Sequence, residues 1–229
     1  LGTSPMIRSD ICVRGAARIN ELAADASCRT AAAAGAELMF IQGGTSDFGD
    51  VLRSGVLTLS QLNPTPHRLV LYQPPVLGSS EPGNYQNYHR LLSDPEIVAS
   101  ADRGVVLAPV GFAFQLWRVR EPTVQLVGDD AHTNRLGAYL IAAVLYQAAF
   151  SRPAPAWVPS TIDPDLAARL RMIAMQAFAE RPCPDGTCTE TFGACTDGID
   201  NAGDGYIDCL DNDCLLTNDQ CGERQCTDG

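Results

Sequence analysis

The chain has 229 residues, of which 45% are hydrophobic and 19% charged, a composition that excludes a disordered acidic polypeptide. Its net charge of −11 comes from 27 acidic residues against 16 basic ones, all of them Arg. A nucleic-acid partner is therefore not expected.

Apolar patterning predicts strands that alternate with helices. Helices are expected where apolar residues recur at helical spacing, and buried strands where short apolar runs end at Gly or Pro. In chain order the expected elements are helix 14–34, strand 37–41, helix 50–62, strand 68–72, loop 78–88, helix 87–101, strand 104–110, a helical segment 112–117, turn 128–132, helix 134–150 and helix 163–180. This alternation predicts an α/β fold with a parallel sheet covered on both faces.

The net charge and the cysteine content of the chain both change near residue 181. Residues 181–229 carry eleven acidic residues against two arginines, a net charge of −9, and seven of the nine cysteines. Such a density of cysteine indicates disulfides formed in an oxidising compartment. We therefore expect a domain over 1–180, a Cys- and Asp-rich tail over 181–229, and a secreted or cell-surface protein.

The residues at the two ends of the chain bear on whether it has been processed, and the length of its apolar runs bears on whether it spans a membrane. Leu1 is preceded by neither an initiator Met nor a visible leader, so we expect that an upstream segment has been removed. Residues 226–229 repeat the Cys-Thr-Asp-Gly of 195–198, so we expect the chain to stop inside a second repeat. The longest apolar run, 136–150, is shorter than the roughly 18 to 20 residues of a membrane span, and no span is expected in this fragment.

The turn before helix 134–150 holds a carboxylate and an imidazole. Asp129 and His132 are three residues apart, so the carboxylate can accept a proton from one imidazole nitrogen while the other nitrogen acts as a base. Ligands of open α/β sheets bind at the carboxyl ends of the strands, which this turn is expected to face. A plainer interpretation stays open, in which the Asp caps the helix and the His is merely exposed.

The surrounding residues resemble the SGNH (GDSL-like) hydrolase superfamily. The segment Leu107-Ala-Pro-Val-Gly-Phe-Ala-Phe114, then Asp129-Asp-Ala-His132 and Gly137-Ala-Tyr-Leu140, is similar to a bacterial subgroup with P-V-G-x-A, D-x-x-H and G-x-Y-L blocks. Phe40-Ile41-Gln42 and Leu71-Tyr72-Gln73 stand where that subgroup has its central strands, so the resemblance covers residues 37 to 180. It implies a three-layer, flavodoxin-like sheet whose first strand precedes this chain.

The resemblance implies a serine esterase that needs no cofactor for catalysis. His132 would take the proton of the serine and Asp129 would orient His132, with Asp130 as the competing carboxylate. The nucleophile would be Ser4, in Gly2-Thr3-Ser4, or a serine upstream of Leu1, and Ser46 is a weaker alternative.

The same resemblance implies an oxyanion hole after strand 37–41. Its donors would be the nucleophile's N–H, Gly44 and Ser46, which stands where the superfamily's G-x-N-D block has Asn.

The remaining histidines and aromatic residues carry weaker signals. His67 and His89 have no Cys, His or carboxylate at ligand spacing, so both are predicted to be surface residues. Tyr85, Tyr88 and Trp117 would line an acyl or sugar pocket or, more in keeping with aromatic residues near strand ends, pack in the core.

The tail contains a candidate calcium loop. Asp200, Asp204, Asp208 and Asp211 fall at positions 1, 5, 9 and 12 of such a loop, with Gly205 at position 6. The stretch resembles thrombospondin type 3-like Cys/Asp-rich repeats, which implies bound Ca²⁺. The alternative is an acidic spacer held by disulfides with no metal.

Two functions from different classes follow. The first is a secreted serine esterase or acetylesterase that acts on a small ester or an acylated polysaccharide. The second is a catalytically inactive glycan-binding or adhesion module on a calcium-stiffened stalk. A serine within hydrogen-bond reach of His132 would distinguish them.

Overall fold

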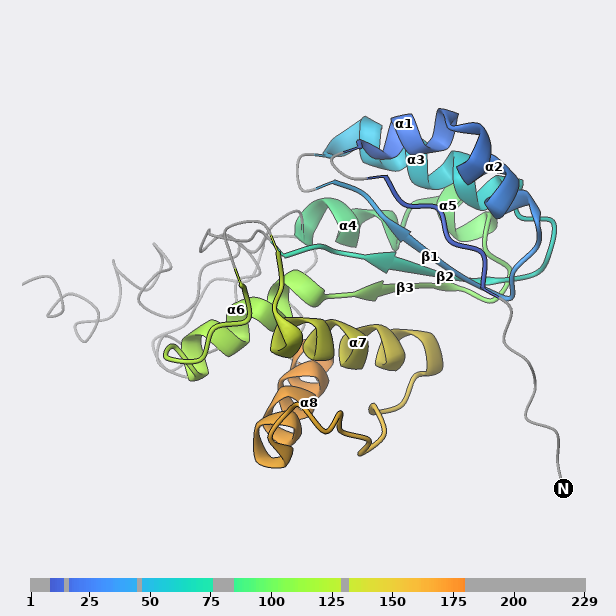
Figure 1. Cartoon of the computed structure of the whole chain (residues 1–229). Helices are drawn as coiled ribbons and strands as arrows, with labels where there is room; N and C mark the ends of the chain where they lie inside the picture. Colours follow the sequence, from blue (N-terminus) through green and yellow to red (C-terminus); the bar gives the residue numbers. More distant parts are fainter. Residues whose placement is uncertain (1–8, 15–16, 45–46, 76–84, 129–131, 180–229) are drawn as a thin grey trace, which may run out of the picture.

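A computed structural model describes residues 9–14, 17–44, 47–75, 85–128 and 132–179 (Figure 1). Its elements in chain order are α1 (Ile19–Ala24), α2 (Ala26–Ala33), β1 (Leu38–Gln42), α3 (Gly49–Leu62), β2 (Arg68–Tyr72), α4 (Tyr85–Leu91), α5 (Pro95–Ala99), β3 (Val105–Ala108), α6 (Val110–Arg120), α7 (Arg135–Phe150) and α8 (Pro164–Ala179). No helix in this described part is long and apolar enough to cross a membrane.

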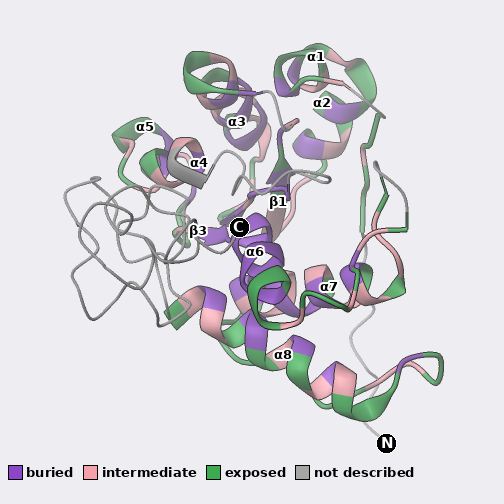
Figure 2. Ribbon diagram, turned by 90° about the vertical axis from the view of Figure 1, so that its left-hand side faces the viewer, coloured by how far each residue is buried: buried purple, intermediate pink, exposed green. Residues whose placement is uncertain are grey.

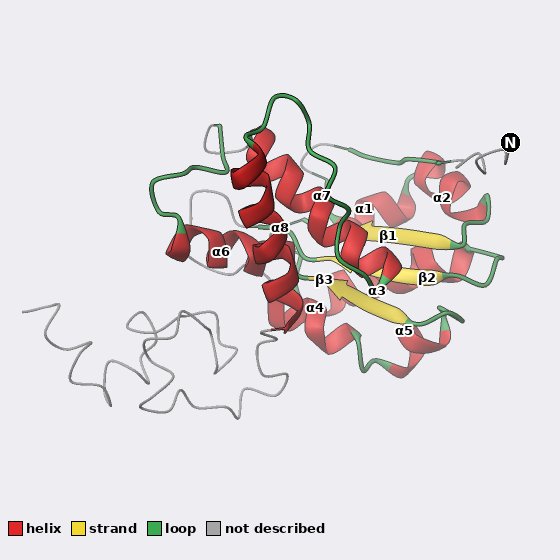
Figure 3. Cartoon of the chain, turned by 90° about the horizontal axis from the view of Figure 1, so that it is seen from below, coloured by secondary structure: helices red, strands yellow, loops and turns green. Residues whose placement is uncertain are grey.

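The three strands form one parallel sheet in the order β1-β2-β3. The central strand, β2, is the most buried, and Leu69, Val70 and Leu71 have no exposed surface. Helices α1, α2 and α3 lie on one side of the sheet and α7 lies on the other, with α8 packed against α7 (Figures 1 and 3). The prediction of an α/β fold with a parallel sheet is confirmed.

Helix α7 runs antiparallel to the strands. Arg68, the first residue of β2, donates from Nη1 to the carbonyl oxygens of Ala149 (2.9 Å) and Ala148 (3.5 Å) and to the Ser151 hydroxyl (2.9 Å). These groups end α7, so its last turn lies at the amino ends of the strands. Its first turn, which follows the predicted Asp129–His132 turn, consequently lies at the carboxyl ends.

Two of the predicted helices are broken by an aspartate. The expected helix over 14–34 is divided into α1 and α2 because the Asp25 carboxylate accepts the N–H groups of Ser27 and Cys28 and starts a new helix. The expected helix over 87–101 is divided into α4 and α5 in the same way by Asp94, followed by Pro95. The expected strands agree with the structure to within two residues at each end.

The prediction that His67 is a surface residue was wrong, because this side chain is 1% exposed. Its Nε2 lies 3.1 Å from the Ser60 hydroxyl and its Nδ1 lies 3.0 Å from the Thr65 carbonyl oxygen. The Ser100 hydroxyl donates to the Ser60 hydroxyl at 2.7 Å. His67 is therefore part of a buried polar cluster at the amino ends of the strands, where it joins α3 to β2.

A disulfide between Cys12 and Cys28 ties residues 9–14 to α2. The same segment leaves Ile11 77% and Val13 84% exposed, so apolar burial does little to hold it in place. The covalent bond is thus one attachment of this segment to α2.

Replacing both cysteines by serine tests this attachment. The Cys12→Ser/Cys28→Ser protein should lose about 3 kcal/mol of stability, because the bond closes a loop with a sequence separation of 16. The melting temperature should fall by about 6 to 12 °C in a thermal denaturation experiment. The exposed Ser9→Ala, on the same segment, serves as the control and should leave it unchanged. An unaltered melting temperature in the double variant would show that the disulfide is dispensable.

Candidate active site at the carboxyl edge of the sheet

The carboxyl ends of β1, β2 and β3 form one edge of the sheet, and α6 lies at this edge (Figure 2). Helix α6 follows β3 after Pro109, and its residues from Val110 to Trp117 are all buried. The first turn of α7 lies at the same edge because of the direction of that helix. The edge therefore gathers the described residues that directly follow each strand, together with His132.

The turn after β1 is held by two buried side chains. Gly43 donates its N–H to the Tyr88 hydroxyl oxygen at 2.7 Å, and Gly44 donates its N–H to Oδ2 of Asp47 at 2.7 Å. Tyr88 and Asp47 are both fully buried. A Cβ atom at Gly43 would lie 2.9 Å from the Tyr88 oxygen and from Cδ1 of Leu52, so no larger residue fits there without movement.

Two tyrosines at this edge are uncharged. Burial raises the pKa of Tyr72 to about 12 and also raises the pKa of Tyr88, against the opposing effect of its hydrogen bond from Gly43. Tyr88 consequently keeps its proton at neutral pH while it accepts the Gly43 N–H. The prediction that Tyr88 packs in the core is confirmed, as it is for Trp117 at 1% exposure.

The end of β2 is joined to α6 through Gln73. Its backbone N–H donates to Ala108, and its carbonyl oxygen accepts from Gly111 at 3.1 Å. The side-chain oxygen accepts the Phe112 N–H at 3.2 Å, and the side-chain nitrogen donates to Pro74. A Cβ atom at Gly111 would overlap the Gln73 carboxamide, so the glycine is required for this contact.

The segment that leads into α7 is fixed at its base by Asn134. Its side-chain oxygen accepts from Leu136 and Gly137 and caps α7, while its side-chain nitrogen donates to Gln125 at 2.8 Å. Gly128 donates its N–H to the His132 carbonyl oxygen at 2.9 Å. His132 is exposed.

Most of the residues predicted for the site lie outside the described residues. These are Ser4, Ser46, Asp129 and Asp130, and in the tail Asp200, Asp204, Asp208 and Asp211. Of the predicted catalytic and oxyanion residues the structure describes His132 and Gly44, and it brings both elements that carry them to the carboxyl edge. The Gly44 N–H is bonded to Asp47, so it would have to exchange this partner, or share it, in order to bind an oxyanion.

Sequence reasoning missed the side chains that shape this edge. Asp47 closes the Gly44-Thr45-Ser46-Asp47 stretch that was compared with the G-x-N-D block, and that position was the signal available for it. For Tyr88 the sequence predicted burial but not the bond to Gly43, and for Gln73 it did not predict the bond to Phe112, since each of these partners lies more than thirty residues away in the chain.

The described residues contain one cluster of metal-ligand type, Cys12, Asp25 and Cys28. The two sulfur atoms are joined to each other as a disulfide, so they offer no thiolate to a metal ion. The cluster lies between α2 and residues 9–14, away from the carboxyl edge.

Comparisons with protein-family models, with curated proteins and with solved structures find no match to this chain.

Gly137→Ala tests how closely α7 must approach the segment before it. A Cβ atom at Gly137 would overlap the Leu126 carbonyl oxygen and lie 3.1 Å from Cβ of Thr133. Because the overlapped atom belongs to the backbone, the cost should lie near ~3 kcal/mol, the upper end of the usual overpacking range, and should exceed the roughly 1 kcal/mol that Ala gains over Gly in a helix. Thermal denaturation should show a lower melting temperature. Gly128→Ala is the matched control, since its Cβ would meet nothing closer than 3.9 Å, and equal melting temperatures for the two variants would contradict the close approach.

Proposed function

We propose that this chain is a serine ester hydrolase of the SGNH type, with its active site at the carboxyl edge of the sheet. The observation that carries the proposal is the direction of α7, which brings the segment ending in His132 to the same edge as the Gly43–Gly44 turn. The parallel order β1-β2-β3, with helices on both faces, is compatible with a three-layer flavodoxin-like fold.

The proposed reaction needs only groups of this chain, a serine and water. The serine oxygen attacks the ester carbonyl while His132 takes the serine's proton, and Asp129 orients the imidazole. The tetrahedral intermediate then expels the alcohol, which receives that proton from His132, and an acyl-enzyme is left. Water, activated in the same way by His132, attacks the acyl-enzyme and releases the acid and the free serine. The substrate would be a small ester or an acylated carbohydrate.

One observation favours a second candidate, the inactive glycan-binding or adhesion module. The N–H groups of Gly43 and Gly44, which are donors of the kind that bind an oxyanion, are both bonded to buried side chains of the protein. A binding module makes no demand on these N–H groups, whereas in an esterase the Gly44 N–H would be shared between Asp47 and the oxyanion, or the oxyanion would be bound by other donors.

His132→Ala decides between the two. If His132 is the base, hydrolysis of a short acyl ester by the full-length protein should lose about 10² to 10⁴ in kcat, since that is the usual contribution of a general base. Arg135→Ala, at the exposed position that starts α7, is the control and should keep wild-type activity. Retention of more than about a tenth of the activity by the His132 variant would exclude the proposed role.

A serine-directed phosphonate would identify the nucleophile in the same preparations. Labelling should depend on His132, and peptide mapping should place it at Ser4, at a serine upstream of Leu1 or at Ser46. A protein that neither hydrolyses esters nor takes up the label is the binding module.

The tail carries a separate proposal, a calcium site formed by Asp200, Asp204, Asp208 and Asp211. Four carboxylates within twelve residues repel one another at neutral pH unless a cation is bound, so Ca²⁺ should order this segment. Millimolar calcium should therefore protect residues 195–214 of the oxidised protein from limited proteolysis, and a chelator should remove the protection. Identical cleavage patterns with and without calcium would leave an acidic disulfide spacer.

A further inference from the structure

Asp47 is a fully buried carboxylate at the carboxyl edge, where the turn after β1 meets the start of α1. Its Oδ2 accepts the N–H of Gly44 at 2.7 Å and the N–H of Ile19 at 2.8 Å. Its own N–H donates to the Gly44 carbonyl oxygen at 3.1 Å. One carboxylate therefore fixes both the shape of the turn and its distance from α1.

The partner at the start of α1 is itself rigidly placed. The Ile19 side chain is fully buried and lies against Gly55 of α3, where a Cβ atom would come within 2.5 Å of it. Because α1 is held by this packing, the Ile19 N–H offers Asp47 a fixed donor. Through Asp47, the position of α1 therefore constrains the position of Gly44.

The turn is also held from its opposite end. The Tyr88 hydroxyl accepts the N–H of Gly43, the residue before Gly44, and Tyr88 belongs to α4. Asp47 and Tyr88 together leave the two glycines little freedom to move.

We propose that Asp47 is a positioning residue of the active site, which acts through Gly44 and does not touch the substrate. This inference rests on the proposed hydrolase function. In that reaction the turn after β1 borders the place where the ester carbonyl would bind, and a displacement of about 1 Å at such a place can cost 10²-fold in rate. Asp47 would hold the turn in the shape that the reaction requires.

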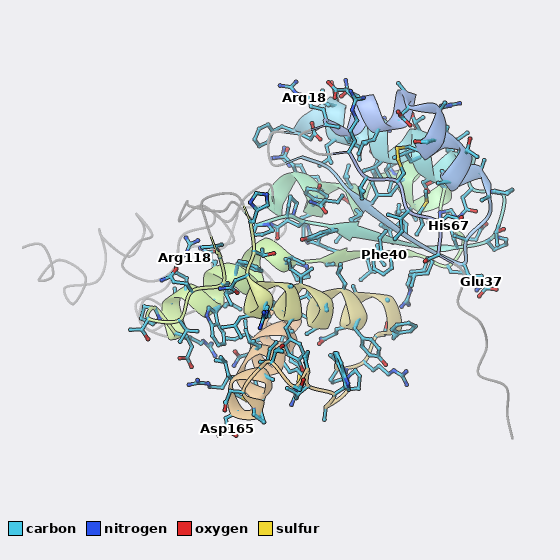
Figure 4. The ribbon with its side chains drawn as sticks, viewed as in Figure 1. Arg18, Glu37, Phe40, His67, Arg118 and Asp165 are labelled. Atoms are coloured by element: carbon cyan, nitrogen blue, oxygen red, sulfur yellow. A yellow bond between two sulfur atoms is a disulfide. The ribbon has the colours of Figure 1, made fainter. Side chains whose placement is uncertain are left out.

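A merely structural role would also lower stability when Asp47 is replaced, so a matched control is needed. His67 provides it, since it is 1% exposed, is hydrogen-bonded to α3 as well as to its own loop, and lies at the amino ends of the strands. Figure 4 shows His67 and Glu37 at one end of the sheet and Arg118, on α6, at the other. His67→Ala should destabilise the protein without moving the turn after β1.

The experiment compares Asp47→Ala, Asp47→Asn and His67→Ala in the full-length protein. Melting temperatures are measured first, and kcat and KM for a short acyl ester are then measured well below the lowest of them. Asp47→Ala should lower kcat by about 10-fold or more with KM within about twofold, because the turn loses its shape and not its binding surface. His67→Ala should keep wild-type kcat per folded molecule. Asp47→Asn retains an acceptor oxygen without the charge, so its kcat should fall between those of wild type and Asp47→Ala.

The outcomes separate this inference from the function on which it rests. Equal kcat for Asp47→Ala and His67→Ala, with His132→Ala inactive, would overturn the positioning role and leave the hydrolase standing. Wild-type hydrolysis that does not depend on His132 would overturn the hydrolase and the inference together. If Asp47→Ala does not fold, Asp47→Asn decides, since an unchanged kcat in that variant would exclude the role.

Discussion

The guanidinium of Arg68 sets the direction of α7, and the candidate site depends on that direction. A cation at the last carbonyl groups of a helix is favoured by the helix dipole, and here it is supplied by the first residue of the central strand. Since the end of α7 is thereby kept at the amino ends of the strands, its beginning and His132 must lie at the carboxyl ends. At the other end of the helix, the Asn134 cap and the close approach of Gly137 to Leu126 fix the start of α7 in the same way.

The carboxyl edge owes its shape to buried polar side chains as much as to the strands. Asp47, Tyr88 and Gln73 are fully buried, and each binds backbone groups of a turn that follows a strand or, for Asp47 and Gln73, also of a helix start. A buried polar group is costly unless it is hydrogen-bonded, so each of these side chains holds its turn in one geometry. Preorganisation of this kind suits a catalytic site and a binding site equally, which is why the two proposed functions share one scaffold.

The parts of the fold that depend on local pattern were predictable from the sequence. Strand β2 was predicted at 68–72 and is found there, because an apolar run between a Pro and a Pro-Pro pair leaves little choice of boundaries. The breaks at Asp25 and Asp94 were missed, since an aspartate within an apolar periodic stretch can equally stay in the helix. His67 was misplaced because its partner Ser60, which itself accepts from Ser100, approaches it only after α3, β2 and the end of α5 have packed together. For the site, the motifs indicated which segments meet, whereas the bond of Gly43 to Tyr88 and the bond of Asp47 to Ile19 join residues that are distant in the sequence.

At Gly43, Gly55, Gly111 and Gly137 a neighbouring group lies too close to leave room for a Cβ atom. The neighbour is a buried side chain at the first three positions and a backbone oxygen at Gly137. These contacts join β1 to α4, α3 to α1, α6 to β2, and α7 to the segment before it. Among homologous sequences, the four positions should vary far less than the apolar residues around them. A core side chain can be exchanged for another of similar volume, whereas any residue other than glycine at these contacts would add a Cβ atom that does not fit. Relatives that have diverged beyond recognition in their cores should still keep glycine at these contacts.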